Sequence, residues 1–293
     1  MADHEHDALR LGYVVVAHTR PAQVARLVER LSREGDRVYL HVDRRVDIAP
    51  FLAALGPAGE RSSVVLLPRV RCRWGGWGIV AATLAGLRAA TTGTDRPDHL
   101  LLLSGLDYPV APRDRLAAHL AASDGAIFTE AERMPVADLP DGGGLDRLTR
   151  RYLRPARAWS LPNRRIPWWP ERRLPAGLEP HHGSQFWCMP REAAEWIRDE
   201  LDRRPELERF WASSFVADEH AIPSLLMSGP LRDRVAGHHL HHMRHPHGQS
   251  HPDLLRAEDV GELRASGAFL ARKFDETVHP GALDAVEREL LDV

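Results

Sequence analysis

Leu11-Gly-Tyr-Val-Val-Val-Ala17 and the helical pattern that opens at Pro21 together give the clearest fold signal in the chain. The first seven residues are apolar and rich in valine, which favours a strand buried on both faces. Proline is favoured in the first turn of a helix. Apolar residues then recur at helical spacing, at Val24, Leu27, Val28 and Leu31. The stretch therefore predicts a strand that leads into an amphipathic helix.

The same alternation of strand and helix continues along the chain. We expect further strands at 38–42, 64–67, 99–103, 126–129 and 185–189. We expect helices at 48–55, 79–90, 113–122, 191–201, 221–227 and 283–291. This order predicts an α/β fold with a mostly parallel sheet and helices on both faces. We expect residues 1–10 to form a flexible tail and residues 11–293 a single domain.

Parallel sheets of this kind bind ligands at the carboxyl ends of their strands. The residues that follow the predicted strands are therefore the first candidates for a binding site. They are His18, Asp43, Arg69 and the segment 104–107, Ser-Gly-Leu-Asp.

Residues 131–182 interrupt the alternation with a segment rich in Pro, Arg and Trp. Between Arg147 and Arg173 there are nine arginines and one acidic residue, with Trp159, Trp168 and Trp169 interleaved. Long irregular insertions are commonly functional or mobile. Arginine and tryptophan suit an acidic or sugar acceptor or a membrane surface, and a solvated loop anchored by its tryptophans is the alternative.

Composition excludes several classes of protein. The chain has 293 residues, 43% hydrophobic and 27% charged, with a net charge of −2, which describes a globular protein and argues against a nucleic-acid partner. Two cysteines are too few for a disulfide framework. The polar N-terminus and the absence of a long apolar run predict no transmembrane segment, and we expect a cytoplasmic protein.

The basic residues are 38 arginines and one lysine, Lys273. A composition that favours arginine so strongly suggests that a surviving lysine stands where arginine cannot replace it. A site shaped around a compact ammonium group would reject the planar guanidinium. Chance survival is the alternative.

Several nucleotide and hydrolase motifs are missing. No G-x-G-x-x-G follows the first strand, and no Walker sequence or G-x-S-x-G elbow occurs. No D-x-D pair is present to hold a divalent cation. If phosphate charge must be neutralised in this protein, side chains must do it.

Two polar segments have more than one interpretation. Residues 238–251 contain seven histidines, which suit zinc or nickel, but they lack a fixed ligand spacing, so we favour a partly buried polar segment. Asp218-Glu219 precedes a predicted helix, where the helix dipole favours a carboxylate. The aromatic stretch 210–215 before it would also supply apolar walls for a catalytic base.

Seven blocks of sequence together resemble glycosyltransferase family 14, which includes the core-2 and I-branching N-acetylglucosaminyltransferases and the peptide O-xylosyltransferases. Each block alone is weak evidence for the family, but seven blocks in the same order as in the family are specific. The blocks are Tyr13-Val-Val-Val-Ala-His18, His41-Val-Asp43, Trp74-Gly75, Leu103-Ser-Gly-Leu-Asp-Tyr-Pro109, Gly183-Ser-Gln-Phe-Trp187, Asp218-Glu219 and Phe269-Leu-Ala-Arg-Lys-Phe-Asp275.

The resemblance implies a GT-A fold, a UDP-sugar donor, inversion at the anomeric carbon and no metal cofactor. UDP-GlcNAc and UDP-xylose are the expected donors, and a glycan, glycoside or other hydroxyl compound is the expected acceptor. In the family pattern, the glutamate of the Asp-Glu block is the general base, which here is Glu219. The diphosphate-binding lysine corresponds to Lys273, and Arg244 is the best counterpart of a second diphosphate-binding cation.

The remaining expected site residues follow from position as well as from the resemblance. Asp43 matches the acid near the nucleoside, and His18 and Asp107 stand at neighbouring strand ends, so all three are expected on the nucleoside side. Trp168 and Trp169 are expected to contact the acceptor. Two alternatives remain open: a catalytically silent sugar- or nucleotide-binding relative, and a histidine-dependent metallohydrolase built on residues 238–251.

Overall fold

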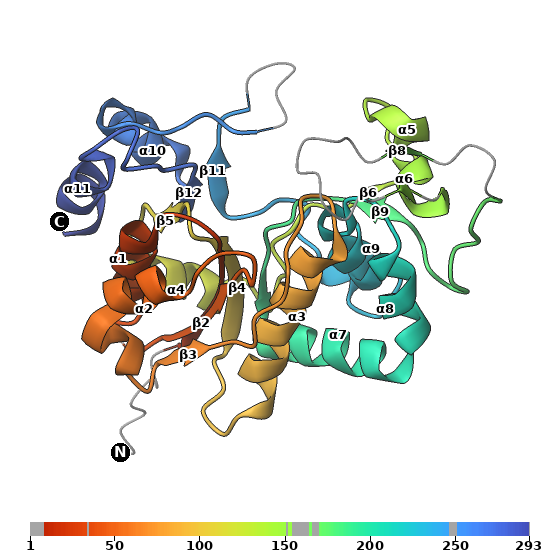
Figure 1. Ribbon diagram of the computed structural model, residues 1–293, viewed down its shortest axis with the longest axis horizontal. Helices are drawn as coiled ribbons and strands as arrows, with labels where there is room; N and C mark the ends of the chain where they lie inside the picture. The colour runs from red at the N-terminus through yellow and green to blue at the C-terminus, as the bar shows by residue number, and fades with distance from the viewer. Residues whose placement is uncertain are drawn as a thin grey trace.

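The structure, a computed structural model, describes residues 9–33, 35–150, 152–153, 164–165, 170–245 and 251–292. These residues form an α/β fold in which helices cover both faces of a central sheet (Figure 1). The mostly parallel sheet expected from the sequence is confirmed. Of the expected tail, only residues 9 and 10 belong to the described part.

The central sheet has five strands in the order β10-β4-β1-β2-β3. Four of them run parallel, and β10 runs antiparallel to β4. The strands are β1 (Leu11–Ala17), β2 (Arg37–Val42), β3 (Val64–Leu66), β4 (His99–Ser104) and β10 (Cys188–Pro190). The stretch that opens the chain thus forms the middle strand, where hydrogen bonds to β2 and β4 satisfy its backbone.

β1 is apolar along its whole length because its side chains pack alternately into two hydrophobic cores, one on each face of the sheet. Val15 packs into the core formed with α1 (Pro21–Leu31), α2 (Ala49–Leu55) and α4 (Arg113–Ala121). Val14 points to the opposite face and packs with α3 (Trp77–Thr92) and α7 (Arg191–Arg203). Gly86 permits the close approach of α3, because a Cβ there would lie 2.4 Å from Val14 Cγ1.

The helical pattern after Pro21 is confirmed by α1. All four of its periodic apolar residues are buried, while Arg26 and Arg30 on the other side form ion pairs with carboxylates near the C-terminus of the chain. The amphipathic period therefore sets which side of the helix meets the sheet.

A second, three-stranded sheet lies next to the carboxyl end of β4 (Figure 1). It consists of β11 (His241–Met243), β12 (Leu270–Arg272) and β5 (Asp107–Pro109), in that order. β11 is parallel to β12, and β12 is antiparallel to β5. Each strand has three residues, which is too short for periodicity to reveal, so the sequence did not predict this sheet.

Two expected strands differ from the structure. Residues 126–129 do not form a strand, because Ile127 and Phe128 each make only an isolated bridge, to Val235 and Cys188. The expected strand at 185–189 is shifted to β10, since only its last residues align with β4.

The remaining elements lie mostly in the insertion and the C-terminal half. In the described part of the insertion they are β6 (Glu132–Arg133), α5 (Pro140–Gly143), α6 (Leu145–Thr149), β7 (Tyr152–Leu153), β8 (Arg164–Arg165) and β9 (His181–His182). They continue with α8 (Pro205–Ala212), the 3₁₀ turn η2 (Ala217–Glu219), α9 (Ala221–Met227), α10 (Val260–Ser266) and α11 (Ala282–Val286). Within the described ranges, every helix is too short or too polar to span a lipid bilayer. The cytoplasmic location stays a prediction.

Candidate active site

Lys273 and Arg244 follow adjacent parallel strands and so stand side by side at one edge of the second sheet. The register pairs Met243 of β11 with Arg272 of β12, and each cation is the next residue along its strand. Among the residues that the structure describes, the Lys273 ammonium makes no hydrogen bond or ion pair. Arg244 differs, because it forms two hydrogen bonds with Asp259 (2.8 and 3.0 Å) and one with Glu262 (2.9 Å).

The charge at Lys273 is therefore available to an anion. Its side chain is half-buried, and burial together with the neighbouring Arg272 lowers the pKa of the ammonium from its usual value. Desolvation and a like charge make an added anion more favourable at this position. That Arg244 also binds the diphosphate stays a prediction, since two carboxylates already neutralise its guanidinium.

The segment around Lys273 is tied to the start of α1. Arg20 donates two hydrogen bonds to Asp275, at 2.8 and 2.7 Å, and this interaction lowers the pKa of the carboxyl to about 2. The Gln23 amide donates to the carbonyl of Phe274 and accepts from the backbone nitrogen of Glu276. These contacts hold Lys273 next to the carboxyl end of β1.

Asp107 is fully buried and pairs across β5 and β12 with Arg272, the residue before Lys273. Its carboxylate accepts hydrogen bonds from the backbone nitrogen and the hydroxyl of Ser104, both at 2.7 Å. Arg272 Nη1 and His241 Nε2 approach it at 3.4 and 3.6 Å. Burial raises the pKa of Asp107, but Arg272 and His241 outweigh it and lower the net value. These contacts favour a positioning role, and direct contact with a nucleoside stays a prediction.

Asp43 and His18 stand at the ends of β2 and β1. The buried Asp43 carboxylate accepts two hydrogen bonds from the Arg45 side chain, at 2.9 and 2.6 Å, and others from the backbone nitrogens of Arg45 and Cys72. These bonds outweigh burial and lower its pKa. His18 is exposed, yet partial desolvation lowers its pKa, and Asp43, Arg45 and Lys273 all act on it. The structure therefore brings Lys273 close to His18 and Asp43, at the carboxyl ends of β1 and β2. We call this region the strand-end edge. Contacts of these residues with a nucleoside stay predictions.

Glu219 occupies the last position of η2, beside β9. Its carboxylate accepts a hydrogen bond from Arg147 Nη1 (3.2 Å), and His182 Nδ1 lies 3.9 Å from the same oxygen. Burial and the neighbouring Asp218 raise the pKa of Glu219 to about 7, although Arg147 acts in the opposite direction. A carboxylate with a pKa near neutrality is matched to general-base catalysis.

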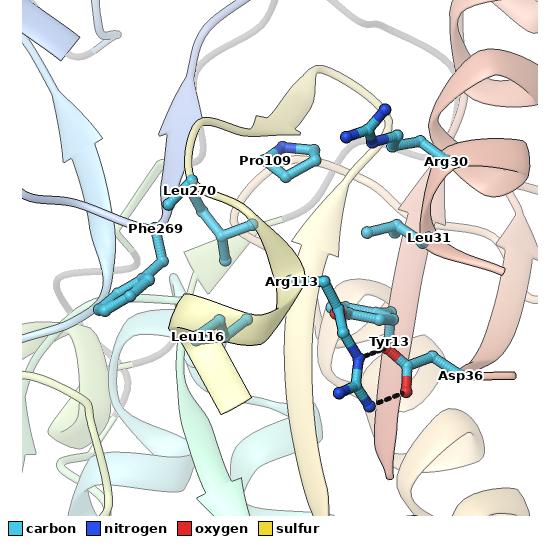
Figure 2. A pocket seen from close by; sticks show the side chains of 10 residues that line it. Tyr13, Arg30, Leu31, Asp36, Pro109, Arg113, Leu116, Phe269 and Leu270 are labelled. Carbon is cyan, nitrogen blue, oxygen red and sulfur yellow. Dashed lines mark hydrogen bonds and ion pairs between the residues drawn. The ribbon is translucent and has the colours of Figure 1, made fainter. Parts of the chain in front are cut away.

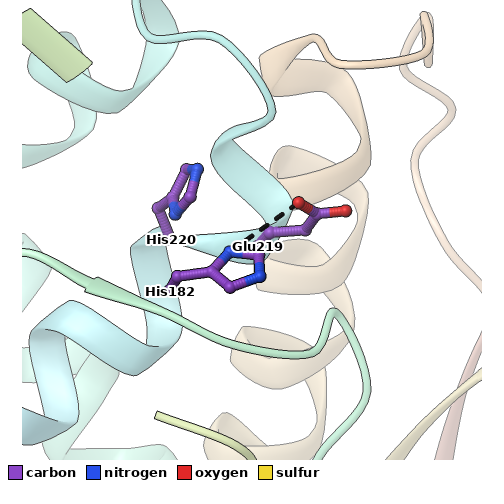
Figure 3. Close-up of side chains that lie close together, drawn as sticks. All are labelled: His182, Glu219 and His220. Carbon is purple, nitrogen blue, oxygen red and sulfur yellow. Dashed lines mark ion pairs between the residues drawn. The ribbon is translucent and has the colours of Figure 1, made fainter. Parts of the chain in front are cut away.

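Two histidines adjoin Glu219. His220 is fully buried, and its ring lies 5.3 Å from that of His182. Burial lowers the pKa of His182 to about 4 and that of His220 to about 3, so both imidazoles are neutral at pH 7. Among the described residues, the donor atoms of this triplet, His182, Glu219 and His220, form the one group that could hold a metal ion, and they lie within 4.8 Å of one another (Figure 3).

Residues 183–187 connect the segment that carries Glu219 to the surroundings of Lys273. The backbone nitrogen of Gly183 donates to the carbonyl of Glu219 at 2.8 Å. Three residues further on, the Phe186 ring contacts His241 at 4.6 Å between centroids and supports the Arg272 guanidinium at 4.4 Å. The Gly183–Trp187 block therefore touches both halves of the candidate site.

Trp74, shortly before α3, is an aromatic residue that was not expected in the site from the sequence. It is 65% exposed and packs edge-on against Phe215, with 5.7 Å between ring centroids. The backbone of Val216 donates to Gly75, and that of Phe215 donates to Arg147, the ion-pair partner of Glu219. The Trp74-Gly75 block carried the only signal for this position in the sequence.

In the described part of the histidine-rich run, histidines contact an aromatic ring or a carboxylate of neighbouring segments. His241 stacks on Phe186, and His242 Nε2 lies 2.9 Å from Glu262. Within the described residues, no metal-binding group of three includes a histidine from this run. Trp168 and Trp169, the expected acceptor contacts, lie outside the described residues.

A cavity away from the strand ends is too small for a substrate (Figure 2). It measures about 30 Å³ and lies near the start of β1, between Tyr13, Leu31 and the Asp36–Arg113 ion pair. Such a volume holds about one or two water molecules. This cavity therefore does not belong to the candidate site, which consists of the strand-end edge and the Glu219 region.

The chain is similar in sequence to known proteins. The profile of the Core-2/I-Branching enzyme family matches residues 11–265, and the chain belongs to this family. The resemblance expected from the seven sequence blocks is thereby confirmed, although the match ends before the block that contains Lys273.

The more particular similarities are to xylosyltransferases. Xylosyltransferase 1 of Homo sapiens is 26% identical over 236 residues, covering 79% of this chain and 24% of that protein. Xylosyltransferase 2 of Rattus norvegicus is 24% identical over 307 residues, covering 96% of this chain and 34% of that protein. The chain spans about a quarter to a third of the length of these relatives. A 4-diphosphocytidyl-2C-methyl-D-erythritol synthase from Anaerococcus prevotii overlaps with a TM-score of 0.33 at 8% identity, covering 67% of this chain and 77% of that one.

Proposed function

We propose that this chain is an inverting glycosyltransferase with a GT-A-like fold, which moves a sugar from a UDP-sugar to an acceptor hydroxyl. The observation that carries the proposal is that Lys273 and Glu219, a cation and a carboxylate, both belong to the candidate site. One is a cation at the strand-end edge with no described partner, and the other is a carboxylate with a pKa near 7. The Gly183–Trp187 segment contacts the surroundings of both. Membership of the family and the likeness to xylosyltransferases support a glycosyl-transfer reaction.

In this proposal Glu219 is the general base. The acceptor oxygen attacks the anomeric carbon from the face opposite UDP, its proton passes to the Glu219 carboxylate, and the bond between the anomeric carbon and the UDP oxygen breaks. A single displacement of this kind inverts the anomeric centre. Arg147 keeps part of the Glu219 population ionised at neutral pH, because its positive charge opposes the effect of burial on the pKa.

Lys273 stabilises the departing UDP. Negative charge develops on the β-phosphate as the glycosidic bond breaks, and an ammonium fixed at that oxygen stabilises the transition state more than the ground state. Asp107 holds Arg272 directly before Lys273, and Arg20 holds Asp275 directly after Phe274. With side chains in this role, the reaction needs no metal ion, and Arg244 would contribute after exchanging a carboxylate for phosphate.

Trp74 would form part of the acceptor side of the site. An exposed indole offers a flat apolar surface to the C–H face of a sugar ring, and Phe215 fixes its orientation. Backbone hydrogen bonds join its neighbour Gly75 to Val216, and Phe215 to Arg147, the partner of Glu219, so the indole belongs to the part of the fold that carries the base. Trp168 and Trp169 remain further candidates for the same role.

The test compares four donors, UDP-GlcNAc, UDP-xylose, UDP-glucose and UDP-galactose, with and without EDTA, and follows UDP release in the presence of a panel of glycoside acceptors. We expect release from UDP-GlcNAc or UDP-xylose, unchanged by EDTA. Glu219→Gln should lower turnover by about 10²–10⁴-fold, because the amide cannot accept a proton, and should keep UDP affinity within twofold of wild type.

Glu195→Gln is the matched control, since Glu195 lies on α7 and its carboxylate forms an ion pair with Arg96, which is not a residue of the candidate site. UDP binding without turnover of any donor would favour a silent binding protein. Activity that EDTA abolishes and Mn²⁺ restores would contradict the metal-independent mechanism.

A further inference from the structure

His182, Glu219 and His220 bring three metal-binding side chains to one place. Figure 3 shows the His182 ring facing the Glu219 carboxylate, with His220 beside them. One donor atom from each lies within 4.8 Å of the others, and His182 Nδ1 is 3.9 Å from Glu219 Oε2. Two segments of the chain supply them: His182 belongs to β9, and Glu219 and His220 are consecutive residues where η2 leads into α9.

The two histidines have coordinating capacity that the fold leaves unused. Within the described part of the chain, neither ring nitrogen of the buried His220 has a hydrogen-bond partner of acceptable geometry, and the buried His182 Nδ1 also has none. Buried polar atoms are normally hydrogen-bonded, so unpaired nitrogens that adjoin a carboxylate require an explanation. A ligand that accepts lone pairs at this position would provide one.

The donor set selects the class of ligand. Two imidazole nitrogens and one carboxylate oxygen are typical ligands of zinc in sites that keep a fourth position open. At bond lengths of about 2.0–2.1 Å, tetrahedral zinc ligands lie about 3.4 Å apart. The present spacing needs closure by roughly 1.5 Å, which side-chain rotation of the half-buried His182 and Glu219 can supply.

We propose that His182, Glu219 and His220 form a binding site for Zn²⁺ or a similar divalent transition-metal ion, and that occupancy of this site inhibits the enzyme. Metal binding would use the carboxylate lone pair that the acceptor proton requires. It would also compete with Arg147, whose guanidinium holds the same Glu219 oxygen and opposes a second cation. The inhibitory consequence rests on the proposed function, whereas the metal site itself does not.

The histidine-rich run 238–251 is the competing source of metal affinity in this chain. The triplet and the run share no residue, so substitutions separate them. His182→Ala and Glu219→Gln each remove one ligand of the triplet. The double variant His245→Asn/His247→Asn removes two histidines of the run and serves as the matched control.

The first experiment measures Zn²⁺ binding by calorimetry on the full chain after removal of bound metal, with no donor or acceptor present. The visible absorption of bound Co²⁺ reports whether the site is four-coordinate. We expect one tight site in the wild type, at least tenfold weaker binding in His182→Ala and Glu219→Gln, and unchanged affinity in the double variant. Arg147→Ala should bind Zn²⁺ several-fold more tightly, because a like charge is removed.

The proposal is overturned if the double variant loses the tight site while His182→Ala keeps it, since the ion is then adventitious on the run. Absence of binding at micromolar Zn²⁺ overturns it as well. His182 is the preferred position because it lies on a short strand near the surface, whereas substitution of the buried His220 risks misfolding.

A second experiment tests the consequence. Once a donor is known, Zn²⁺ should lower the activity of the wild type at least tenfold, and EDTA should restore it. The activity of His182→Ala with Zn²⁺ should stay within twofold of its own activity without Zn²⁺. Tight binding at the triplet without inhibition would overturn the regulatory part of the proposal. Failure of every donor would instead count against the proposed function, while the calorimetric result would still decide the metal site.

Discussion

The backbone nitrogen of Gly183 donates a hydrogen bond to the carbonyl oxygen of Glu219 at 2.8 Å. This bond joins β9 and its following turn to the segment that carries the proposed base. The position admits glycine alone, because a Cβ on Gly183 would lie 1.9 Å from the carbonyl oxygen of Glu130. The placement of Glu219 therefore depends on a residue 36 positions earlier in the chain.

We predict that Gly183→Ala impairs transfer more than it impairs folding. The added methyl group must displace the backbone near Glu130, at a cost of about 1–3 kcal/mol of stability. The shift also moves the hydrogen-bond donor of Glu219. Thermal unfolding and kcat should be measured together with Gly261→Ala, which lies in α10 at an ordinary backbone conformation and whose Cβ would meet no atom within 4 Å. Wild-type kcat in Gly183→Ala would show that the base does not depend on this contact.

The activity should rise with pH through neutrality. Glu219 acts as a base only when ionised, and burial raises its pKa to about 7, so kcat/KM should increase with pH and level off above that value. Arg147 lowers this pKa, so Arg147→Ala should move the midpoint to higher pH. A pH–rate profile of the two proteins checks both statements. An unchanged midpoint in Arg147→Ala would contradict the assignment of the titrating group to Glu219.

Lys273→Arg should be impaired although the charge is conserved. The position is half-buried beside Arg272, and a planar guanidinium does not fit a pocket shaped around an ammonium. Lys273→Ala should be worse, losing about 2–4 kcal/mol of transition-state stabilisation, or roughly 30- to 800-fold in kcat. The measurements are kcat and UDP affinity, with circular dichroism as the control for folding. Full activity in Lys273→Arg would make the single lysine an accident of composition.

Trp74→Ala should raise the KM of the acceptor and leave the KM of the donor unchanged. Its indole is exposed, so truncation costs little stability, and Trp74→Phe should recover part of the affinity because an aromatic face remains. Leu52→Ala is the matched control, since Leu52 is an exposed apolar residue on α2. Equal changes in both KM values would assign Trp74 a structural role.

Local patterns in the sequence were sufficient to predict the layered α/β fold and the positions of most of its main strands along the chain, but not the order of those strands in the sheet. The apolar run at Leu11–Ala17 and the helical period after Pro21 are local patterns, written in residues that are neighbours in the chain. Strand ends follow from the same patterns, which is why His18 and Asp43 could be expected at one edge of the sheet. Lys273 was expected from the composition and from the family resemblance, because the short strand before it has no local signal. The family resemblance, carried by ordered blocks, was the basis for expecting Glu219 as the base.

Tertiary structure alone decided how these residues are surrounded. Asp107 is enclosed because β12 pairs with β5 across more than 160 residues, and Arg244 is neutralised by carboxylates that follow it on a separate turn and helix. The pairing of His182 with Glu219 arises in the same way. Burial, pKa and metal-binding geometry depend on contacts between distant segments, and no local period in the sequence encodes those contacts.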